Sequence, residues 1–113
     1  MHTWENFCKW FENKFHFQPE MTNIFFLIGV QELKKGYKDF SRKEKLELIR
    51  LGKCKILSIM GYLEHTGFDN EKWPVWEKKS NFTELEKHNE QKILKKGILA
   101  YFEKQGLPGN NKQ

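Results

Sequence analysis

The chain has 113 residues, of which 31% are charged and 15% aromatic. This length suits one domain with a single core, and the abundance of apolar residues excludes an intrinsically disordered chain. The net charge is +5, and the longest apolar run, Ile24 to Val30, is far shorter than the roughly 20 residues of a membrane span.

The first predicted helix runs from about Trp4 to Phe15, with Thr3 as its N-cap. At 100° per residue, one face gathers five side chains: Trp4, Phe7, Cys8, Phe11 and Phe15. This pattern is typical of an amphipathic helix that packs on a core. Trp10 lies outside that face and is expected to pack on a neighbouring loop or on a partner.

A second helix is predicted from Pro19 to Lys35, with Gly36 ending it. Its apolar run, 24–28, points in nearly every direction, which predicts a central helix covered on several sides. A buried strand is the alternative for so short an apolar run. The low content of β-branched residues favours the helix.

The third helix has the strongest local signal, because Ser41-Arg42-Lys43-Glu44 matches a capping box. It is predicted to reach about Met60, with Gly52 where another helix approaches closely. Its expected core stripe contains Leu46, Ile49, Ile56, Leu57 and Met60, and Leu48 and Ile59 widen it to about half of the circumference. Lys53 interrupts this stripe, and its ammonium group is expected to extend to water or to a carboxylate.

The helical period fails between residues 61 and 80, where Gly67, Asp69, Asn70 and Pro74 favour turns. Segments 62–66 and 73–77 are expected to pair as a short hairpin, or else to form a structured loop. Pro74 cannot donate to a β-ladder, so its strand would lie at an edge.

A last helix is predicted from about Thr83 to Lys104, with its core stripe at Leu94, Ile98, Tyr101 and Phe102. The predicted fold is therefore mainly α. It is a four-helix single domain over residues 1–104, with an irregular loop or short β-hairpin between helices three and four. Residues 105–113 are expected to form a flexible C-terminal tail.

Motifs for catalysis or metal binding do not occur in the expected spacing, so we predict no catalytic residues, no metal site and no cofactor. Glu64, His65 and Asp69 are the one acid–base cluster in the irregular region. Cys8 and Cys54 are isolated thiols, as expected in a reducing compartment, and the predicted localisation is cytoplasmic.

Basic residues are concentrated between positions 34 and 55, a window that contains nine basic and three acidic residues. This window suggests an alternative function, a lysine-rich nucleic-acid-binding helical module. Its candidate contacts are Lys35, Lys38, Arg42, Lys43 and Lys45. Because 18 of the 20 basic residues are lysines, base-specific reading by arginine is disfavoured.

Trp73-Pro74-Val75-Trp76 places two of the four tryptophans in the irregular region. They either plug the core or line a groove for a partner, since tryptophan dominates interface hot spots. The leading prediction is a small soluble, non-catalytic protein–protein interaction module that binds another protein, a peptide or a second copy of the chain. Candidate partner-binding residues are Trp73, Trp76, Phe68, Tyr62 and His65.

Overall fold

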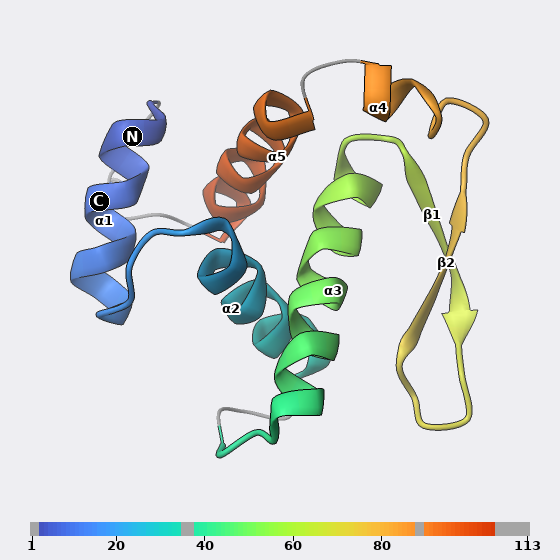
Figure 1. Cartoon of the computed structure of the whole chain (residues 1–113), viewed down its shortest axis with the longest axis horizontal. Helices are drawn as coiled ribbons and strands as arrows, with labels where there is room; N and C mark the ends of the chain where they lie inside the picture. Colours follow the sequence, from blue (N-terminus) through green and yellow to red (C-terminus); the bar gives the residue numbers. More distant parts are fainter. Residues whose placement is uncertain (1–2, 35–37, 88–89, 106–113) are drawn as a thin grey trace.

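The structure is a computed structural model that describes residues 3–34, 38–87 and 90–105. The fold is mainly α, as predicted, with a two-stranded antiparallel sheet between α3 and α4 (Figure 1). Its elements are α1 (Trp4–Phe15), α2 (Met21–Leu33), α3 (Arg42–Ile59), β1 (Leu63–Phe68), β2 (Pro74–Lys78), α4 (Glu84–Lys87) and α5 (Glu90–Lys104). In Figure 1, α1 and the hairpin lie on opposite flanks of α2, α3 and α5.

The predicted start of α1 is confirmed, because the Thr3 hydroxyl accepts a hydrogen bond of 3.1 Å from the Asn6 amide. The start of α2 differs from the prediction. Glu20 is the N-cap residue, so Pro19 precedes the helix instead of occupying its first turn. At the other end, Lys34 adopts a left-handed conformation with φ of 60°. The predicted stop at Gly36 lies outside the described residues.

The capping box of α3 is confirmed. The Glu44 amide donates to the Ser41 hydroxyl at 3.1 Å, and the Ser41 amide donates to the Glu44 carboxylate at 2.8 Å. Two otherwise unsatisfied backbone donors are thereby paired at the helix start.

The contact between α2 and α3 is the most extensive between two helices of the fold. A Cβ atom built on Gly29 would collide with the backbone carbonyl of Leu48, and one on Gly52 with that of Phe25. Only a hydrogen fits between the two backbones at each point, so the glycine α-hydrogens face those carbonyl oxygens. The close approach predicted at Gly52 is confirmed, and Gly29 is its counterpart on α2.

The predicted core stripe of α3 is partly wrong. Leu46 is 61% exposed and Ile59 is 36% exposed. Leu48 is buried as predicted, and Leu51, which was not assigned to the stripe, is buried as well. The first half of α3 turns its buried face toward α2, and the second half buries Ile56 and Leu57 in the main core. One straight stripe therefore does not describe a helix that contacts different neighbours along its length.

The predicted last helix is divided in the structure into the single turn α4 and the longer α5. All four residues of the predicted core stripe of α5 are at most 3% exposed. Within this stripe, Phe102 contacts the rings of Phe7 and Trp10 at centroid distances of 5.2 and 5.6 Å. Trp10 thus packs on the helix α5, and not on the loop that the sequence analysis expected.

A polar contact joins the three central helices. The Tyr101 hydroxyl of α5 donates to the Glu32 carboxylate of α2 at 2.8 Å. The same carboxylate lies 3.7 Å from the Lys55 ammonium of α3. Burial, together with this hydrogen bond and the charge of Glu32, raises the pKa of Tyr101.

The hairpin interpretation of residues 61–80 is confirmed by the pairing of β1 with β2. Gly61, with φ of 89°, ends α3 and leads the chain into β1. The Tyr62 amide donates to the Leu57 carbonyl and the Gly61 amide to the Ser58 carbonyl, which is the Schellman arrangement. This turn sets the hairpin beside α3 (Figure 1).

Candidate functional site

A groove of about 720 Å³ lies between α3 and the hairpin. Its apolar floor includes Leu51, Leu57 and Leu63, which are 4%, 4% and 7% exposed. Its α3 wall follows a stripe of four residues spaced three or four positions apart: Glu47, Arg50, Cys54 and Leu57. Ten positions of α-helix span about 15 Å, so the groove is elongated along the helix.

Both tryptophans of the irregular region line this groove and are half-buried. Trp73 packs against the smaller core cluster of Phe26, Phe40, Leu48 and Leu51. Trp76 contacts both this cluster and the main core. One part of each ring therefore packs on the core, and the rest borders the open groove.

The other predicted partner-binding residues lie near the groove without lining it. His65 contacts the Trp76 ring at a centroid distance of 5.2 Å and the Phe68 ring at 4.9 Å. Phe68 is 65% exposed. Tyr62 is half-buried at the base of the hairpin and packs on the main core. The structure thus brings His65, Phe68 and Trp76 together on the hairpin and leaves Tyr62 apart.

The acid–base residues of this region have structural roles or are exposed. The Asp69 carboxylate accepts hydrogen bonds of 2.9 Å from the amides of Glu71 and Trp73, which holds the tip of the hairpin. Glu64 and His65 are exposed. Both hydrogen bonds go to Oδ1 of Asp69, which gives this carboxylate a structural role in the turn.

Cys54 is a half-buried free thiol in the α3 wall of the groove. Burial raises its pKa, against the opposing effects of the Arg50 charge and hydrogen bond and of the Lys53 charge. The thiol is therefore protonated at neutral pH, and this lowers its nucleophilicity.

Lys53 lies on the rim, where its ammonium group is 3.6 Å from the Glu90 carboxylate. Its predicted extension to water or a carboxylate is confirmed. Within residues 3–34, 38–87 and 90–105, no group of three or more His, Cys, Asp or Glu residues is placed to hold a metal ion. In the same part of the chain, no helix is both long enough and apolar enough to cross a bilayer.

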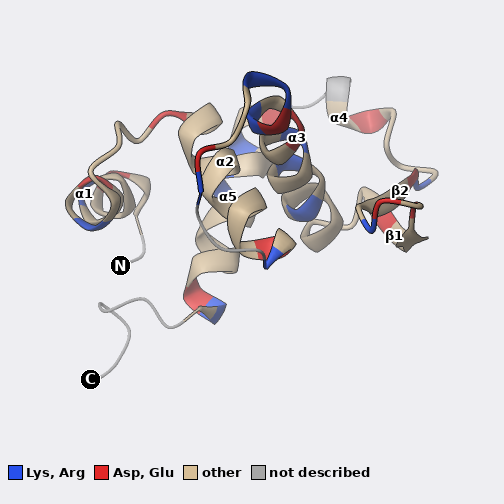
Figure 2. Cartoon of the chain, turned by 90° about the horizontal axis from the view of Figure 1, so that it is seen from below, with Lys and Arg blue, Asp and Glu red and all other residues tan. Residues whose placement is uncertain are grey.

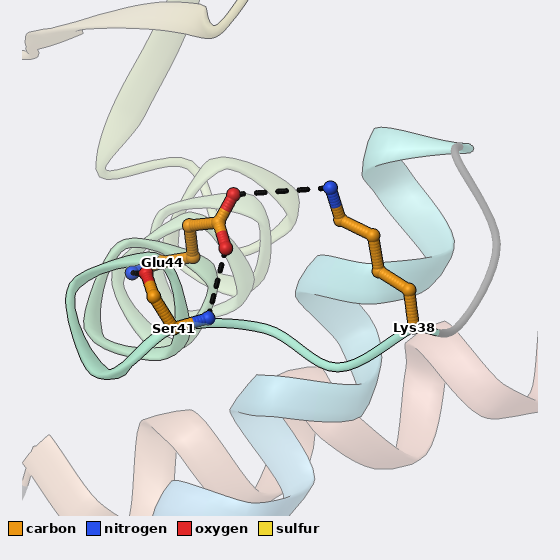
Figure 3. A network of polar contacts seen from close by, with 3 residues as sticks. All are labelled: Lys38, Ser41 and Glu44. Carbon is orange, nitrogen blue, oxygen red and sulfur yellow. Dashed lines mark hydrogen bonds and ion pairs between the residues drawn. The ribbon is translucent and has the colours of Figure 1, made fainter.

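The predicted nucleic-acid contacts lie at the start of α3, away from the groove. Arg42, Lys43 and Lys45 are exposed, whereas the Lys38 ammonium lies 3.9 Å from Glu44 (Figure 3). Figure 2 shows acidic segments interspersed with the basic ones around this end of α3. Lys35 lies outside the described residues.

The α3 wall and Phe82 complete the groove and were missed by the sequence analysis. Their signal is weak, because Glu47, Arg50 and Cys54 form a polar stripe like any solvated helix face. Cys54 is two positions after Gly52, which places it about 200° around the helix from the contact with α2.

No family model matches this chain, and neither a curated protein nor a solved structure shows significant similarity to it.

Proposed function

We propose that the protein is a non-catalytic interaction module that holds a short segment of a partner protein in the groove between α3 and the hairpin. The observation that carries this proposal is the pair of half-buried tryptophans bordering a groove of about 720 Å³. A volume of this size lies within the range of known ligand sites.

The shape of the groove favours a chain segment over a compact small molecule. It follows α3 from Glu47 to Leu57, a length of about 15 Å. An apolar floor with charged side chains along its rim resembles the anatomy of protein interfaces. Trp73 and Trp76 would supply the anchoring contacts, since tryptophan is enriched among residues that dominate binding energy.

The chemistry of the groove supports a binding role over catalysis. Its thiol, Cys54, has a raised pKa, and its lysine, Lys53, lies beside Glu90. Asp69 is held by the backbone of the hairpin tip. Lys53 and Asp69 are therefore engaged by different partners, and the three groups do not converge on one reacting centre, which a catalytic site requires.

The two cysteines allow a direct test, because Cys54 lies in the groove and Cys8 lies on α1. Peptides are first selected from a displayed library on the unmodified protein. They are then titrated against C8S labelled with phenylmaleimide at Cys54, and against C54S labelled at Cys8. We expect the Cys54 label to weaken binding by about tenfold or more, which corresponds to 1.4 kcal/mol, and the Cys8 label to leave it unchanged.

Circular dichroism of both labelled proteins controls for loss of the fold. The proposal fails if no peptide is enriched, or if the selected peptides bind equally well to both labelled proteins.

Nucleic-acid binding is the second candidate function, favoured by the exposure of Arg42, Lys43 and Lys45 within little more than one turn of α3. Three cations at the amino end of a helix are unfavourable for the helix dipole, and an anion bound there would offset this. The pairing of Lys38 with Glu44 and the neighbouring acidic residues count against it.

A gel-shift assay at about 50 mM salt decides this candidate, because phosphate contacts strengthen as salt falls. We expect no shift of duplex DNA or single-stranded RNA. A shift that disappears in the K43E/K45E variant would instead establish the basic end of α3 as the site.

A further inference from the structure

The groove runs along the outer edge of β2, not across the face of the hairpin. It is lined by consecutive β2 residues, including Val75 and Trp76. Neighbouring side chains of a strand point to opposite faces of the sheet, so a groove that touches both must border the strand edge. From β1, only Leu63 at the base contributes.

Hydrogen bonds at the base of the hairpin determine which backbone groups point into the groove. The Lys79 amide donates to the Tyr62 carbonyl at 3.1 Å, so this pair is directed inward. Bonded and non-bonded pairs alternate along an antiparallel ladder. The neighbouring pair, Lys78 with Leu63, is therefore directed outward. The pair of Glu77 with Glu64 is directed inward again, and the pair of Trp76 with His65 is directed outward.

The backbone amides and carbonyls of Trp76 and Lys78 thus point away from β1, at the edge of β2, and both residues line the groove. In the described part of the chain, no hydrogen bond outside the hairpin involves either backbone. Beyond the bulge between His65 and Gly67, the Asp69 amide donates to the Trp73 carbonyl at 2.9 Å. Pro74, the next residue and the first of β2, therefore faces outward as well, and the ladder loses no bond through its missing amide hydrogen. The edge of β2 is therefore short, accessible and equipped with unpaired donors and acceptors, the features that template an added strand.

The dimensions of the groove suit one added strand. β2 has five residues, and an extended strand of five residues spans about 16 Å. This agrees with the span of about 15 Å along the α3 wall. The floor of leucines and tryptophans would receive every second side chain of the added strand.

The charged side chains that line the groove change in sign along its length. At the hairpin tip, the lining includes Glu47, Asp69 and Glu71. Toward the base, the basic residues are Lys53 on α3 and Lys78 on β2, with Arg50 between the two ends. Since α3 and β2 run in the same direction (Figure 1), both walls change from acidic to basic toward the base.

We infer that the groove accepts an extended segment of a partner protein, which pairs antiparallel with β2 as a third strand. This segment carries an acidic side chain near its amino end, beside Lys78, and a basic one near its carboxyl end, beside Glu71. Antiparallel pairing is the more stable of the two strand orientations. The inference rests on the proposed function and adds the binding mode and the chemistry of the partner.

The test uses the full chain and a fluorescein-labelled heptapeptide, Glu-Thr-Val-Thr-Val-Thr-Lys, in fluorescence anisotropy. When its first residue lies opposite Lys78, its third residue lies opposite Trp76 and its fourth opposite Val75. The amide of the third residue then donates to the Trp76 carbonyl, whereas the amide of the fourth points away from β2.

An ester in place of an amide removes the donor without adding bulk, so esters at the third and fourth residues form a matched pair. We expect the ester at the third residue to weaken binding by about threefold to tenfold and the ester at the fourth by less than about twofold. A peptide with its Glu and Lys exchanged should bind several-fold more weakly, and this difference should vanish in about 1 M salt.

Equal effects of the two esters would overturn strand addition while leaving groove binding intact. Failure of the heptapeptide to bind at about 1 mM would overturn it as well. The peptide selection on the unmodified protein, followed by titration against the two labelled proteins, decides separately whether the proposed function fails. A concentration-dependent dimer that the peptide dissociates would show that the edge pairs with a second copy of the chain, which also overturns a partner segment as the occupant.

Discussion

The two sides of α3 are packed in opposite ways. On one side, Gly52 brings the helix so close to α2 that no side-chain atom fits between the backbones. On the other, Trp73 and Trp76 hold the hairpin at a distance and leave a groove of about 720 Å³. The smallest residue closes one gap, and the largest residues bridge the other without filling it.

One side of α3 is therefore rigid, and the opposite side is accessible to a partner. The interlocked side loses nearly all contact with water and leaves little room for rearrangement, as expected for a close-packed interior. The hairpin side retains exposed aromatic surface and open backbone edge. A binding module needs both, because a site is positioned well only when it is built on a rigid element.

The largest expected effect comes from breaking the close side with G52A. The added methyl group meets backbone, which cannot move as a side-chain end can, so we expect a loss of about 3 kcal/mol or more in the free energy of unfolding. Urea titration followed by circular dichroism measures this loss.

The matched control is G97A. A Cβ there meets the side-chain ends Ile56 Cγ2 at 2.5 Å and Met60 Cγ at 2.9 Å. These ends can shift, and alanine favours the helix by about 1 kcal/mol, so the net change should stay within about 1 kcal/mol. Equal losses for both variants would contradict the conclusion that backbone contacts set the distance between α2 and α3.

On the open side, W76A should cost about 2 kcal/mol, because the ring is half-buried. The loss should be local. Amide hydrogen exchange of β1 and β2 should accelerate more than that of α2, since the hairpin can open while the helices remain packed. Uniform acceleration throughout the chain would show that the hairpin and the helices unfold as one unit.

The polar contact among α2, α3 and α5 predicts a pH dependence on the close side. Burial raises the pKa of Tyr101 above its ordinary value of about 10. The folded protein therefore holds the phenolic proton more tightly, and the stability that this provides is complete below pH 10 and is lost as pH rises further. Y101F should be about 1 kcal/mol less stable than the wild type at pH 7.

Above pH 10, the wild type should lose up to about 1.4 kcal/mol per pH unit more than Y101F, so that the two proteins converge. Denaturation at successive pH values measures both curves. Parallel curves would show that Tyr101 does not control the alkaline transition.

The smallest changes in the free energy of unfolding are expected from two lysines on opposite sides of α3. Lys53 pairs with Glu90 on the groove rim, with both side chains more than a third exposed, whereas Lys55 pairs with the less exposed Glu32. We expect K53M to change the free energy of unfolding by less than about 0.5 kcal/mol and K55M to cost about 1 kcal/mol. The reverse order in urea titrations would mean that the rim pair contributes more than exposed pairs usually do.

Local signals explain what could be predicted from the sequence. The caps at Thr3 and Ser41 depend on residues three positions apart, so they can be predicted without knowledge of the tertiary structure. Gly52 was recognisable because a glycine inside a helix costs stability unless another element comes close. The hairpin was one of two alternatives that its turn residues left open.

What remained hidden depends on how elements meet. Leu46 was assigned to the core because a helical wheel assumes one partner along the whole helix, and α3 has several. The groove depends on the direction in which the hairpin leaves Gly61 and on where the two tryptophan rings rest. Neither is a periodic property of the chain, so spacing alone could not reveal the α3 wall.

The paired glycine contacts also offer a means of recognising relatives. Gly29 faces Leu48, Gly52 faces Phe25, and each glycine follows the other's contact residue within its own helix by four positions. The crossing is thus approximately symmetric about a local twofold axis, and a change at either glycine needs a wider crossing that would disturb both. Homologous chains whose overall similarity has faded should still keep these two glycines in two successive helices, each preceded by a large apolar residue one helical turn earlier.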